Sequence, residues 1–566
     1  MNYYTNEKNT LILISLLKKY NIKRIIVSPG ATNVSFVASC QYDGFFEMYS
    51  AFDERSAAFM AYGMAMNSGE PVVLSCTGAT ASRNYIPGLT KAYYDKAPVI
   101  AITSTLNTAK IGHHIPQLID RTQQFVDLVH NSYQLRSIFS KEDENMAITN
   151  LNYFLHEVVD NKSGPCHINL MTNYSYNFSI KTLPECKKIM FYNSSDSLPE
   201  IKLSKIGIFV GNHEPFSEDL TKVIDDFCSI YDCVVLCDKT SNYHGKYEFQ
   251  ASLSNSQEKV LSSRFFDLII HIGSISGAYL VFSAKEVWRV NPDGKYRDTF
   301  GRLSSVFMME EKDFFGWYSK NSPNAQHKDS LLNKCFAERA SLLNKIGDLP
   351  FSNIAIAKTL APMIPNNSVL NLGILNSLRA WNFFDLDNSV FINCNTGGFG
   401  IDGCLSSAIG YATEEPNRDH FIILGDLAFF YDINSLLQSS PNNLHILVVN
   451  NGIGCEFKNY NHRAALFGEK TDLFIAARGH NGCKSKTIIN DFALDNSISY
   501  FCASNMSEFK AAVDDWLKCR NLCIMEVFTC DKDESEALRI MNTLYKDSKV
   551  RIKKRIKSIV KKVLRK

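Results

Sequence analysis

Residues 420–454 read HFIILGDLAFFYDINSLLQSSPNNLHILVVNNGIG and contain two apolar runs, each followed by polar residues and glycine. Short apolar runs bounded by turn residues are typical of buried strands, and the stretch between them suits the crossover of a parallel sheet. Asp426 and Asn451 then stand at the carboxyl ends of the two strands, the edge where open α/β sheets bind ligands. Taken alone, a Gly-Asp and an Asn-Asn-Gly are also ordinary turns, so their surroundings must decide between a turn and a site.

The same alternation of apolar runs and helical stretches extends over most of the chain. The runs are RIIVSPG (24–30), PVVLSCTG (71–78) and APVIAITS (97–104), then KIGIFVGN (205–212), CVVLCDK (233–239) and LIIHIGS (268–274), then SVLNLGILNS (368–377) and SVFINCNTGG (389–398). This pattern predicts an α/β protein with three parallel-sheet domains, which we place at 1–175, 195–330 and 350–535.

Composition indicates a globular protein rather than a membrane or disulfide-rich one. The chain has 566 residues, 45% hydrophobic and 21% charged, and its 16 cysteines include no Cys-x-x-Cys pair. We therefore expect reduced thiols and no zinc site. No apolar run reaches the roughly 18 to 20 residues that span a bilayer, and Lys8, Lys18 and Lys19 interrupt the first segment. These features predict a cytoplasmic location.

The C-terminal segment, 550–566, differs from the rest of the chain. Its RIKKRIKSIVKKVLRK (551–566) carries nine Lys or Arg and no acidic residue, with apolar residues at helical spacing. A basic amphipathic helix of this kind suits an anionic membrane surface, so the protein is expected at the periphery of a membrane's inner face if the tail binds lipid. A solvated, frayed terminus and a protein or nucleic-acid partner are the alternatives. No basic face is apparent elsewhere, so we expect no nucleic-acid binding by the protein as a whole.

The residues at the strand ends of 420–454 suit a phosphate and a hard metal ion. No Gly-x-Gly-x-x-Gly follows a first strand and no Walker-type Gly-Lys-Ser/Thr occurs, so ordinary dinucleotide and P-loop sites lack support. A carboxylate, an amide oxygen and a backbone carbonyl are ligands that Mg²⁺ accepts together with a diphosphate. Gly425, Gly452 and Gly454 would allow close approach of the phosphate.

A family resemblance runs through nearly the whole chain. GDLAFFYDINSL (425–436) followed by VVNNGIG (448–454) resembles the diphosphate and Mg²⁺ motif of thiamine diphosphate-dependent 2-oxo acid decarboxylases and carboligases, and most resembles the menaquinone-pathway 2-succinyl-5-enolpyruvyl-6-hydroxy-3-cyclohexene-1-carboxylate synthases. The family's order is also kept by IIVSPG (25–30), FDERSAAFMAYGMA (52–65), TGATASRNYIPG (77–88), GPCHINL (164–170), RVNPDGKYRD (289–298), ILNSLRAW (374–381) and GGFGIDGCLSSAIG (397–410). The resemblance implies a pyrimidine-binding, a middle and a diphosphate-binding domain, with the cofactor held between the chains of a homodimer or homotetramer.

The resemblance assigns the metal and the principal catalytic residue. It makes Asp426 and Asn451 side-chain ligands of Mg²⁺ and Ile453 the donor of a backbone carbonyl. Glu54 matches the glutamate that bonds the aminopyrimidine of the cofactor and promotes proton removal from thiazolium C2. Burial would raise the pKa of this carboxyl towards the working range. As an alternative, Glu54 is a first-turn residue that favours the helix dipole.

Further cofactor contacts follow from the same match. Ile401 resembles the large apolar residue that holds the cofactor in its bent form, with a core isoleucine as the alternative. Asn376 and Ser377 match a stretch near the cofactor phosphate and the reacting centre. Asp402 precedes a predicted helix near the diphosphate.

Other positions depart from the synthase pattern. The family's SPGSRS is Ser28-Pro29-Gly30-Ala31-Thr32-Asn33 here, so its carboxylate-binding arginine is missing, and further arginines are absent from 104–110 and 396–397. Because arginine binds carboxylates in a bidentate manner, its loss predicts a different substrate. Conversely, Arg83 stands where the family carries a small residue, and Arg297 and Arg379 keep cationic positions of the pattern, so these three are candidate substrate-binding residues.

The segment Gly112-His113-His114 resembles the paired histidines of the decarboxylases. Imidazole exchanges protons near neutral pH, so His113 and His114 are catalytic candidates, and Gln117 is a candidate polar contact to the cofactor. The alternative is a surface loop, and at most one of two adjacent side chains is expected to face a site.

We therefore expect a thiamine diphosphate- and Mg²⁺-dependent transferase or lyase that decarboxylates a 2-oxo acid and transfers the acyl-anion equivalent to a carbonyl or alkene acceptor, forming a C–C bond. The alternatives are the menaquinone-pathway synthase itself, a simple 2-oxo acid decarboxylase, and a catalytically silent scaffold recruited to a membrane by the tail.

Overall fold

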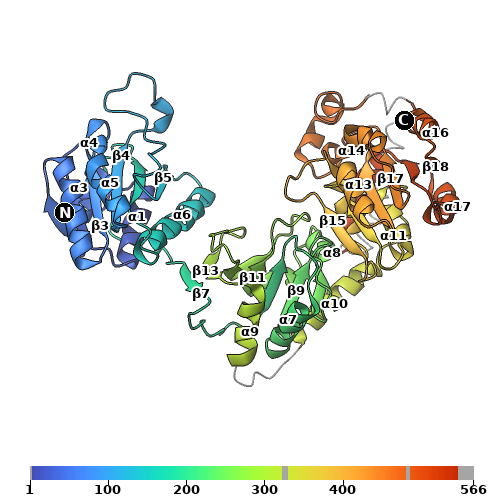
Figure 1. Ribbon diagram of the computed structural model, residues 1–566, viewed down its shortest axis with the longest axis horizontal. Helices are drawn as coiled ribbons and strands as arrows, with labels where there is room; N and C mark the ends of the chain where they lie inside the picture. Colours follow the sequence, from blue (N-terminus) through green and yellow to red (C-terminus); the bar gives the residue numbers. More distant parts are fainter. Residues whose placement is uncertain (1–2, 322–328, 480–484, 546–566) are drawn as a thin grey trace, which may run out of the picture. The chain divides into compact units, whose positions relative to one another are not determined.

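The computed structural model describes residues 3–321, 329–479 and 485–545 (Figure 1), so the predicted basic tail at 550–566 lies outside the described residues. The chain forms two compact units. The first comprises Met1–Ser197 with Glu286–Met308, and the second comprises Leu198–Lys285 with Met309–Lys566.

The first sheet lies wholly in the first unit and is parallel throughout. Its strand order is β2 (Glu47–Ser50), β1 (Arg24–Val27), β3 (Val72–Cys76), β4 (Val99–Thr105), β6 (Cys166–Met171) and β5 (Asn131–Leu135). The surrounding helices are α1 (Lys8–Lys19), α2 (Val34–Tyr42), α3 (Glu54–Ser68), α4 (Thr80–Asn84), α5 (Ile86–Tyr94) and α6 (Lys141–Val159).

Helices cover both faces of this sheet because its strands are apolar on both sides. Val73 packs in a core with residues of α1, α2 and α6, whereas Val72 and Leu74 pack in a second core with residues of α3 and α5. Alternating side chains of one strand thus feed opposite layers, as expected for a doubly wound parallel sheet.

In the second sheet the neighbouring pairs β10–β9, β9–β8, β8–β11, β12–β13 and β13–β7 are parallel. Its order is β10 (Glu248–Gln250), β9 (Cys233–Cys237), β8 (Ile206–Val210), β11 (Phe265–Ile272), β12 (Ser283–Val290), β13 (Leu303–Met308) and β7 (Met190–Asn193). Its main helices are α7 (Glu218–Ile230), α9 (Glu311–Asn321) and α10 (Ser330–Leu343). The short helix α8 (Ser252–Asn255) comes between α7 and α9 in the chain. β7 and β13 fall in the first unit and β8 to β11 in the second.

The third sheet lies in the second unit and contains the two apolar runs of residues 420–454 as strands. Its order is β15 (Phe391–Cys394), β14 (Val369–Leu372), β16 (His420–Gly425), β17 (Leu444–Asn450), β19 (Cys523–Phe528) and β18 (Ser499–Ala503). The helices are α11 (Asn353–Leu360), α12 (Asn376–Trp381), α13 (Cys404–Glu414), α14 (Asp426–Asp432), α16 (Ile488–Asp495), α17 (Met506–Leu517) and α18 (Asp531–Asn542). β16 and β17 are parallel neighbours, with Gly425 opposite Val449.

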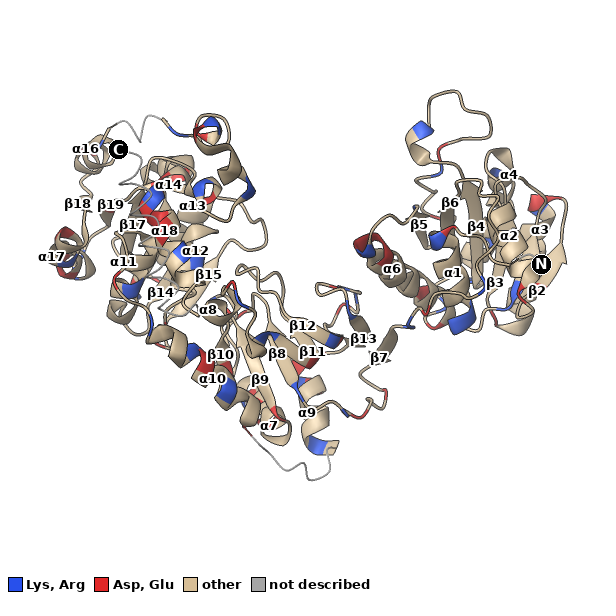
Figure 2. Cartoon of the chain, turned by 180° about the vertical axis from the view of Figure 1, so that it is seen from behind, with Lys and Arg blue, Asp and Glu red and all other residues tan. Residues whose placement is uncertain are grey.

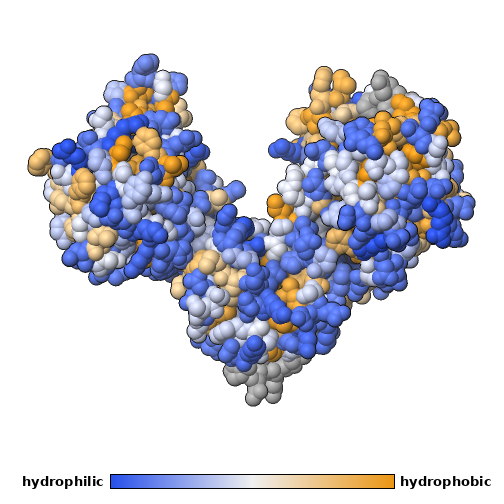
Figure 3. Space-filling view, viewed as in Figure 1, coloured by the Kyte–Doolittle hydropathy of each residue, from blue (hydrophilic) through white to orange (hydrophobic). Residues whose placement is uncertain are grey.

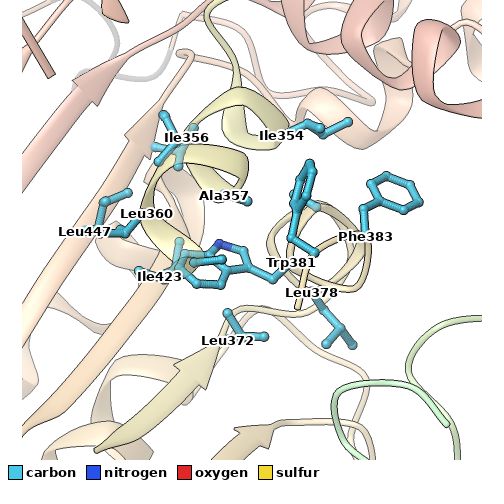
Figure 4. Packing of buried hydrophobic residues seen from close by; sticks show 14 of the residues in the cluster. Ile354, Ile356, Ala357, Leu360, Leu372, Leu378, Trp381, Phe383, Ile423 and Leu447 are labelled. Carbon is cyan, nitrogen blue, oxygen red and sulfur yellow. The ribbon is translucent and has the colours of Figure 1, made fainter. Parts of the chain in front are cut away.

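The core of this third domain fixes the helix that begins at Asn376. Trp381, at the end of α12, is fully buried. Its indole is surrounded by apolar side chains from α11 and from β14, β16 and β17 (Figure 4), among them Ile356, Leu372 and Ile423. Because a buried indole removes a large apolar area from water, it anchors α12 against the sheet.

The predicted fold class is confirmed: the chain contains three parallel sheets flanked by helices. The domain boundaries stay predictions. Within the described ranges, no helix is long and apolar enough to cross a membrane. Figure 2 shows acidic and basic residues mixed on the flanking helices, as on α10, which carries Lys334, Glu338 and Arg339.

Candidate functional site

The predicted cofactor residues of the third domain gather at one edge of its sheet. β15, β14, β16 and β17 are consecutive neighbours and run parallel, so their carboxyl ends share an edge. The segments that follow these strands carry Asn376 after β14, Asp402 after β15, Asp426 after β16 and Asn451 after β17. The structure thus brings together residues that are up to 75 positions apart in sequence at the edge where parallel sheets bind ligands.

Asp426 is the first residue of α14 and is only 2% exposed. Its Oδ2 accepts a hydrogen bond of 2.8 Å from the backbone N–H of Gly452, which joins the ends of β16 and β17. Gly452 has a φ of 69°, the left-handed region that glycine adopts without strain. This tight turn places the Asp426 carboxylate beside the segment 451–453.

Asn451 and Ile453 lie in that turn. The Asn451 side chain is partly exposed, and its Oδ1 accepts a 3.3 Å hydrogen bond from the Ile453 N–H. The Ile453 side chain is 1% exposed and packs with Cys455 and Ala476. Packing on this side fixes the backbone of the turn.

The donor set at this edge fits a magnesium diphosphate. It combines one buried carboxylate, one amide oxygen and backbone carbonyls, which are hard ligands, and it needs further oxygens from a phosphate or water. A Cβ added at Gly425 would meet nothing within 4 Å, so the backbone beside Asp426 faces open space. Asp426, Asn451 and the Ile453 carbonyl are therefore able to hold the ion together with a diphosphate.

Asn376 and Ser377 begin α12, and they differ in exposure. Ser377 is 3% exposed, and its Oγ accepts a hydrogen bond from the Asn353 side chain, whereas Asn376 is only partly buried. The Asn376 Oδ1 accepts hydrogen bonds from Arg379 Nη1 at 2.8 Å and from Asn459 at 3.2 Å. Asn376 therefore belongs to a polar cluster at the sheet edge.

Arg379 is engaged by an acid of its own chain. Its Nη1 and Nη2 donate to the two carboxylate oxygens of Glu456 at 2.6 and 3.0 Å. The pair borders a cavity of about 350 Å³ that Tyr279 and His462 also line. A substrate carboxylate would have to compete with Glu456 for this guanidinium, which sequence reasoning did not anticipate.

Ile401 and Asp402 lie in the loop between β15 and α13. Ile401 is partly buried and contacts the apolar cores on both sides of the third sheet. Asp402 is exposed, and Gly403, with a φ of 73°, immediately precedes α13. The predicted contacts of Ile401 and Asp402 with the cofactor stay predictions.

Glu54 opens α3 in the first unit, after a three-residue connection from the end of β2 at Ser50. Asp53 precedes the helix and accepts hydrogen bonds from the N–H groups of Arg55 and Ser56, which fixes the first turn. The Glu54 carboxylate is partly exposed, and its Oε2 accepts a 3.3 Å hydrogen bond from Asn84 on α4. Asn84 thus orients the carboxylate that the resemblance assigns to the aminopyrimidine.

His113, His114 and Gln117 lie in the loop between β4 and β5, and all three are exposed. His114 and Gln117 have φ values of 54° and 63°, an uncommon conformation for residues other than glycine. Arg83, on α4, is also exposed, and its Nη2 donates to the Asp120 carbonyl at 3.4 Å. Their catalytic or substrate-binding roles stay predictions.

Arg297 forms a bidentate ion pair with Asp293, at 2.7 and 2.5 Å. The pair raises the pKa of Arg297, and the Arg297 guanidinium holds the pKa of Asp293 well below its usual range. Because Asp293 stands only four residues earlier in the chain, the sequence itself contains this partner of Arg297.

Sequence reasoning missed several buried ionisable groups, of which Arg121 and Glu534 matter most below. Arg121 is 4% exposed in the first unit, and Glu534 is 7% exposed in the second. Neither stands in a motif, since Arg121 falls in a loop and Glu534 looks like an ordinary acid in the first turn of a helix. Only contacts with distant residues single them out.

Exposed apolar residues occur near Glu54 in the first unit and after Asn451 in the second unit. On α3, Phe59, Met60 and Met66 are 44%, 43% and 47% exposed, and Phe52, before the helix, is 90% exposed. The segment after Asn451 exposes Leu466, Phe467, Leu473, Phe474 and Ile475. Figure 3 shows such apolar areas on the surface of both units. Large exposed apolar side chains of this kind are typical of interaction surfaces.

Comparisons with known proteins agree with the resemblance. Residues 9–124 match the family described as "Thiamine pyrophosphate enzyme, N-terminal TPP binding domain". A protein of Bacteroides thetaiotaomicron is 28% identical over 471 residues, 80% of this chain and 84% of the relative. One of Flavobacterium johnsoniae is 28% identical over 482 residues, with 79% and 83% covered. One of Porphyromonas gingivalis is 26% identical over 488 residues, with 80% and 84% covered. All three are named 2-succinyl-5-enolpyruvyl-6-hydroxy-3-cyclohexene-1-carboxylate synthase.

Proposed function

We propose that the chain is a thiamine diphosphate-dependent enzyme of the 2-oxo acid decarboxylase and carboligase class, like the relatives it matches, and that it uses Mg²⁺ and joins the decarboxylated donor to an acceptor through a new C–C bond. The observation that carries the metal part of this proposal is the buried Asp426 carboxylate, bonded to Gly452 and flanked by Asn451 at one sheet edge. When bound, the cofactor supplies the electron sink for the loss of CO₂.

The protein's own residues have separate tasks in this proposal. Asp426, Asn451 and the Ile453 carbonyl would hold the metal and the diphosphate, while the Glu54 carboxyl would form a hydrogen bond with the aminopyrimidine and so control its protonation. Asn84 supports that role, because its amide already donates to the Glu54 Oε2 at 3.3 Å. A carboxylate in the first turn of a helix otherwise turns freely towards water, so the hydrogen bond from Asn84 fixes the orientation of the Glu54 side chain.

The acceptor is proposed to differ from that of the named relatives. The stretch Ser28–Asn33 carries no arginine, and two of the three candidate cations, Arg297 and Arg379, are paired with Asp293 and Glu456. Because a paired guanidinium binds a second carboxylate less readily, recognition of a polycarboxylate at these positions is disfavoured.

A homo-oligomer is part of the proposal. The exposed apolar side chains of α3 follow Glu54, and those of 466–475 follow Asn451 in sequence. Burial of both surfaces between copies of the chain would remove them from water. The cytoplasmic location remains a prediction from composition.

The decisive experiment measures CO₂ release from a panel of 2-oxo acids with thiamine diphosphate and Mg²⁺, with and without aldehyde or ketone acceptors. Glu54→Gln should lower turnover by about 10²- to 10⁴-fold, the usual contribution of a positioned acid or base. Glu142→Gln, in the first turn of α6, is the matched control and should retain activity. Release that survives in Glu54→Gln would refute the assigned role of Glu54.

Acceptors distinguish the remaining functions. Stimulation of turnover by an acceptor, with formation of the joined product, supports a carboligase, while release without stimulation indicates a simple decarboxylase. The names of the relatives favour the synthase itself as the second candidate. Turnover of isochorismate with 2-oxoglutarate would establish it. Cofactor binding without release from any donor would indicate the silent scaffold.

A further inference from the structure

A cavity of about 300 Å³ lies in the first unit, on the face of the sheet that α5 covers. It is lined by α4, α5, β4, β6 and the segment 120–129. One part of its wall is apolar and includes Ile86, Leu89 and Leu128. Another part is polar and includes Arg83, Arg121 and His167. None of the residues predicted to contact the cofactor lines it.

Arg121 is the unusual member of this wall. It is 4% exposed, and its guanidinium donates to Ser82 Oγ at 3.2 Å, to the Ser104 carbonyl at 3.3 Å and to Asn169 Oδ1 at 3.1 Å. All three acceptors are neutral. Its Nε–H is buried without a hydrogen-bond partner, and no carboxylate of the described residues forms a salt bridge with it.

The position of Arg121 is fixed by its own backbone. The Arg121 carbonyl accepts hydrogen bonds from Gln124 and Gln134, at 3.2 and 3.3 Å. Asn169, which accepts from the guanidinium, also donates to Gln134 at 2.6 Å. The side chain is therefore held in the wall rather than free to turn towards solvent.

The charges around the cavity favour an anion. Burial and the nearby Arg83 lower the pKa of Arg121 to about 10, so the guanidinium stays charged at neutral pH. Burial and the Arg121 charge lower the pKa of His167 to about 3, so this imidazole is neutral. Asp120 is the only carboxylate in the wall, and its side chain accepts hydrogen bonds from Thr122. A buried cation without a counter-charge costs free energy that a bound anion would offset.

We propose that this cavity binds a small organic carboxylate, whose anionic group pairs with Arg121 and whose apolar body packs against Ile86, Leu89 and Leu128. The apolar wall favours a carboxylate with a hydrocarbon or aromatic body over inorganic phosphate. The proposal does not depend on the proposed function, because binding requires neither the cofactor nor turnover.

Isothermal titration of the full-length protein with sodium benzoate tests the proposal, and benzamide serves as the neutral isostere. Benzoate should bind at one site per chain and benzamide should not. Arg121→Gln should weaken benzoate binding by about tenfold or more, the usual effect of losing a hydrogen bond to a charged group. Arg136→Gln, an exposed arginine of the same unit, should leave it unchanged.

A second variant covers the case in which Arg121→Gln does not fold. Leu89→Trp keeps the guanidinium but fills the apolar part of the cavity, and it should also weaken benzoate binding. Equal binding of benzoate and benzamide would overturn the proposal. So would benzoate affinity that survives both substitutions in protein with an unchanged circular dichroism spectrum.

One matched pair of ligands, phenylpyruvate and 3-phenylpropionate, distinguishes a substrate carboxylate from an effector carboxylate. If phenylpyruvate binds more tightly than 3-phenylpropionate, the cavity selects a 2-oxo acid and holds substrate. If the two bind equally and both require Arg121, the cavity receives a carboxylate effector.

Discussion

At the residue scale, Asp426 should control cofactor binding through the metal. Asp426→Asn keeps the shape of the side chain but removes the negative charge that attracts Mg²⁺. We expect the affinity for thiamine diphosphate in the presence of Mg²⁺ to fall on the order of 100-fold, measured by quenching of intrinsic fluorescence.

Asp419→Asn is the matched control for this substitution, because Asp419 is exposed at the opposite, amino end of β16. It should bind the cofactor as the wild-type protein does. Wild-type affinity in Asp426→Asn would remove Asp426 from the metal site.

Also at the residue scale, Glu534 should make stability depend on pH. Burial raises the pKa of its carboxyl from 4.5 to about 7, against the opposing hydrogen bonds from the Asn353 N–H and the Thr529 hydroxyl. Because the folded protein holds this proton more tightly than the unfolded chain, the contribution is fully present below pH 4.5 and is lost as the pH rises through about 7. The shift corresponds to on the order of 3 kcal/mol.

Chemical denaturation at pH 5 and pH 8 checks this expectation. The wild-type free energy of unfolding should fall between the two conditions by more than that of Glu534→Gln, which cannot ionise. The exposed Glu414→Gln on α13 should keep the wild-type difference. An identical pH dependence in wild type and Glu534→Gln would contradict the assignment.

At the element scale, the packing of α3 on α5 should govern the position of Glu54. A Cβ at Gly88 on α5 would lie 2.4 Å from the Ala58 Cβ and 2.8 Å from the Ala58 carbonyl carbon. Since one contact is to backbone, Gly88→Ala must displace α3, at a cost of about 1 to 3 kcal/mol. We expect a lower melting temperature and reduced CO₂ release.

Gly44→Ala is the control for the change in backbone entropy, because a Cβ at Gly44 meets nothing within 4 Å. Its stability should stay within about 0.5 kcal/mol of the wild type. Unchanged stability and turnover in Gly88→Ala would show that the helix pair tolerates the added carbon.

At the scale of the whole molecule, the proposed oligomer predicts complementation between two inactive variants. If Glu54 of one chain acts with Asp426 of another, mixing Glu54→Gln with Asp426→Asn creates some sites with both residues intact. Random exchange of subunits between dimers should restore about a quarter of wild-type turnover.

The test requires co-refolding or co-expression of the two variants, with each variant alone as the control. Continued inactivity of the mixture, despite mixed oligomers seen by mass spectrometry, would place Glu54 and Asp426 of one chain in the same site.

The sequence by itself determined the three parallel sheets and the position of the third-domain residues at strand ends. These features are local: the runs around Asp426 and Asn451 are short, apolar and followed by glycine, so strand and turn are encoded within a few residues. The first turn of α3 was equally local, because Asp53 caps the helix that Glu54 begins.

Only the tertiary structure decided the state of the charged groups. Arg379 meets Glu456, 77 positions away, and Arg121 is buried among residues of other elements, with no salt bridge to a carboxylate of the described residues. Glu534 is buried against Asn353, 181 positions earlier. Charge pairing and burial arise from neighbours that folding brings together, and a pattern along the chain does not contain those neighbours. By contrast, the Arg297 and Asp293 pair is local and was accessible to sequence reasoning.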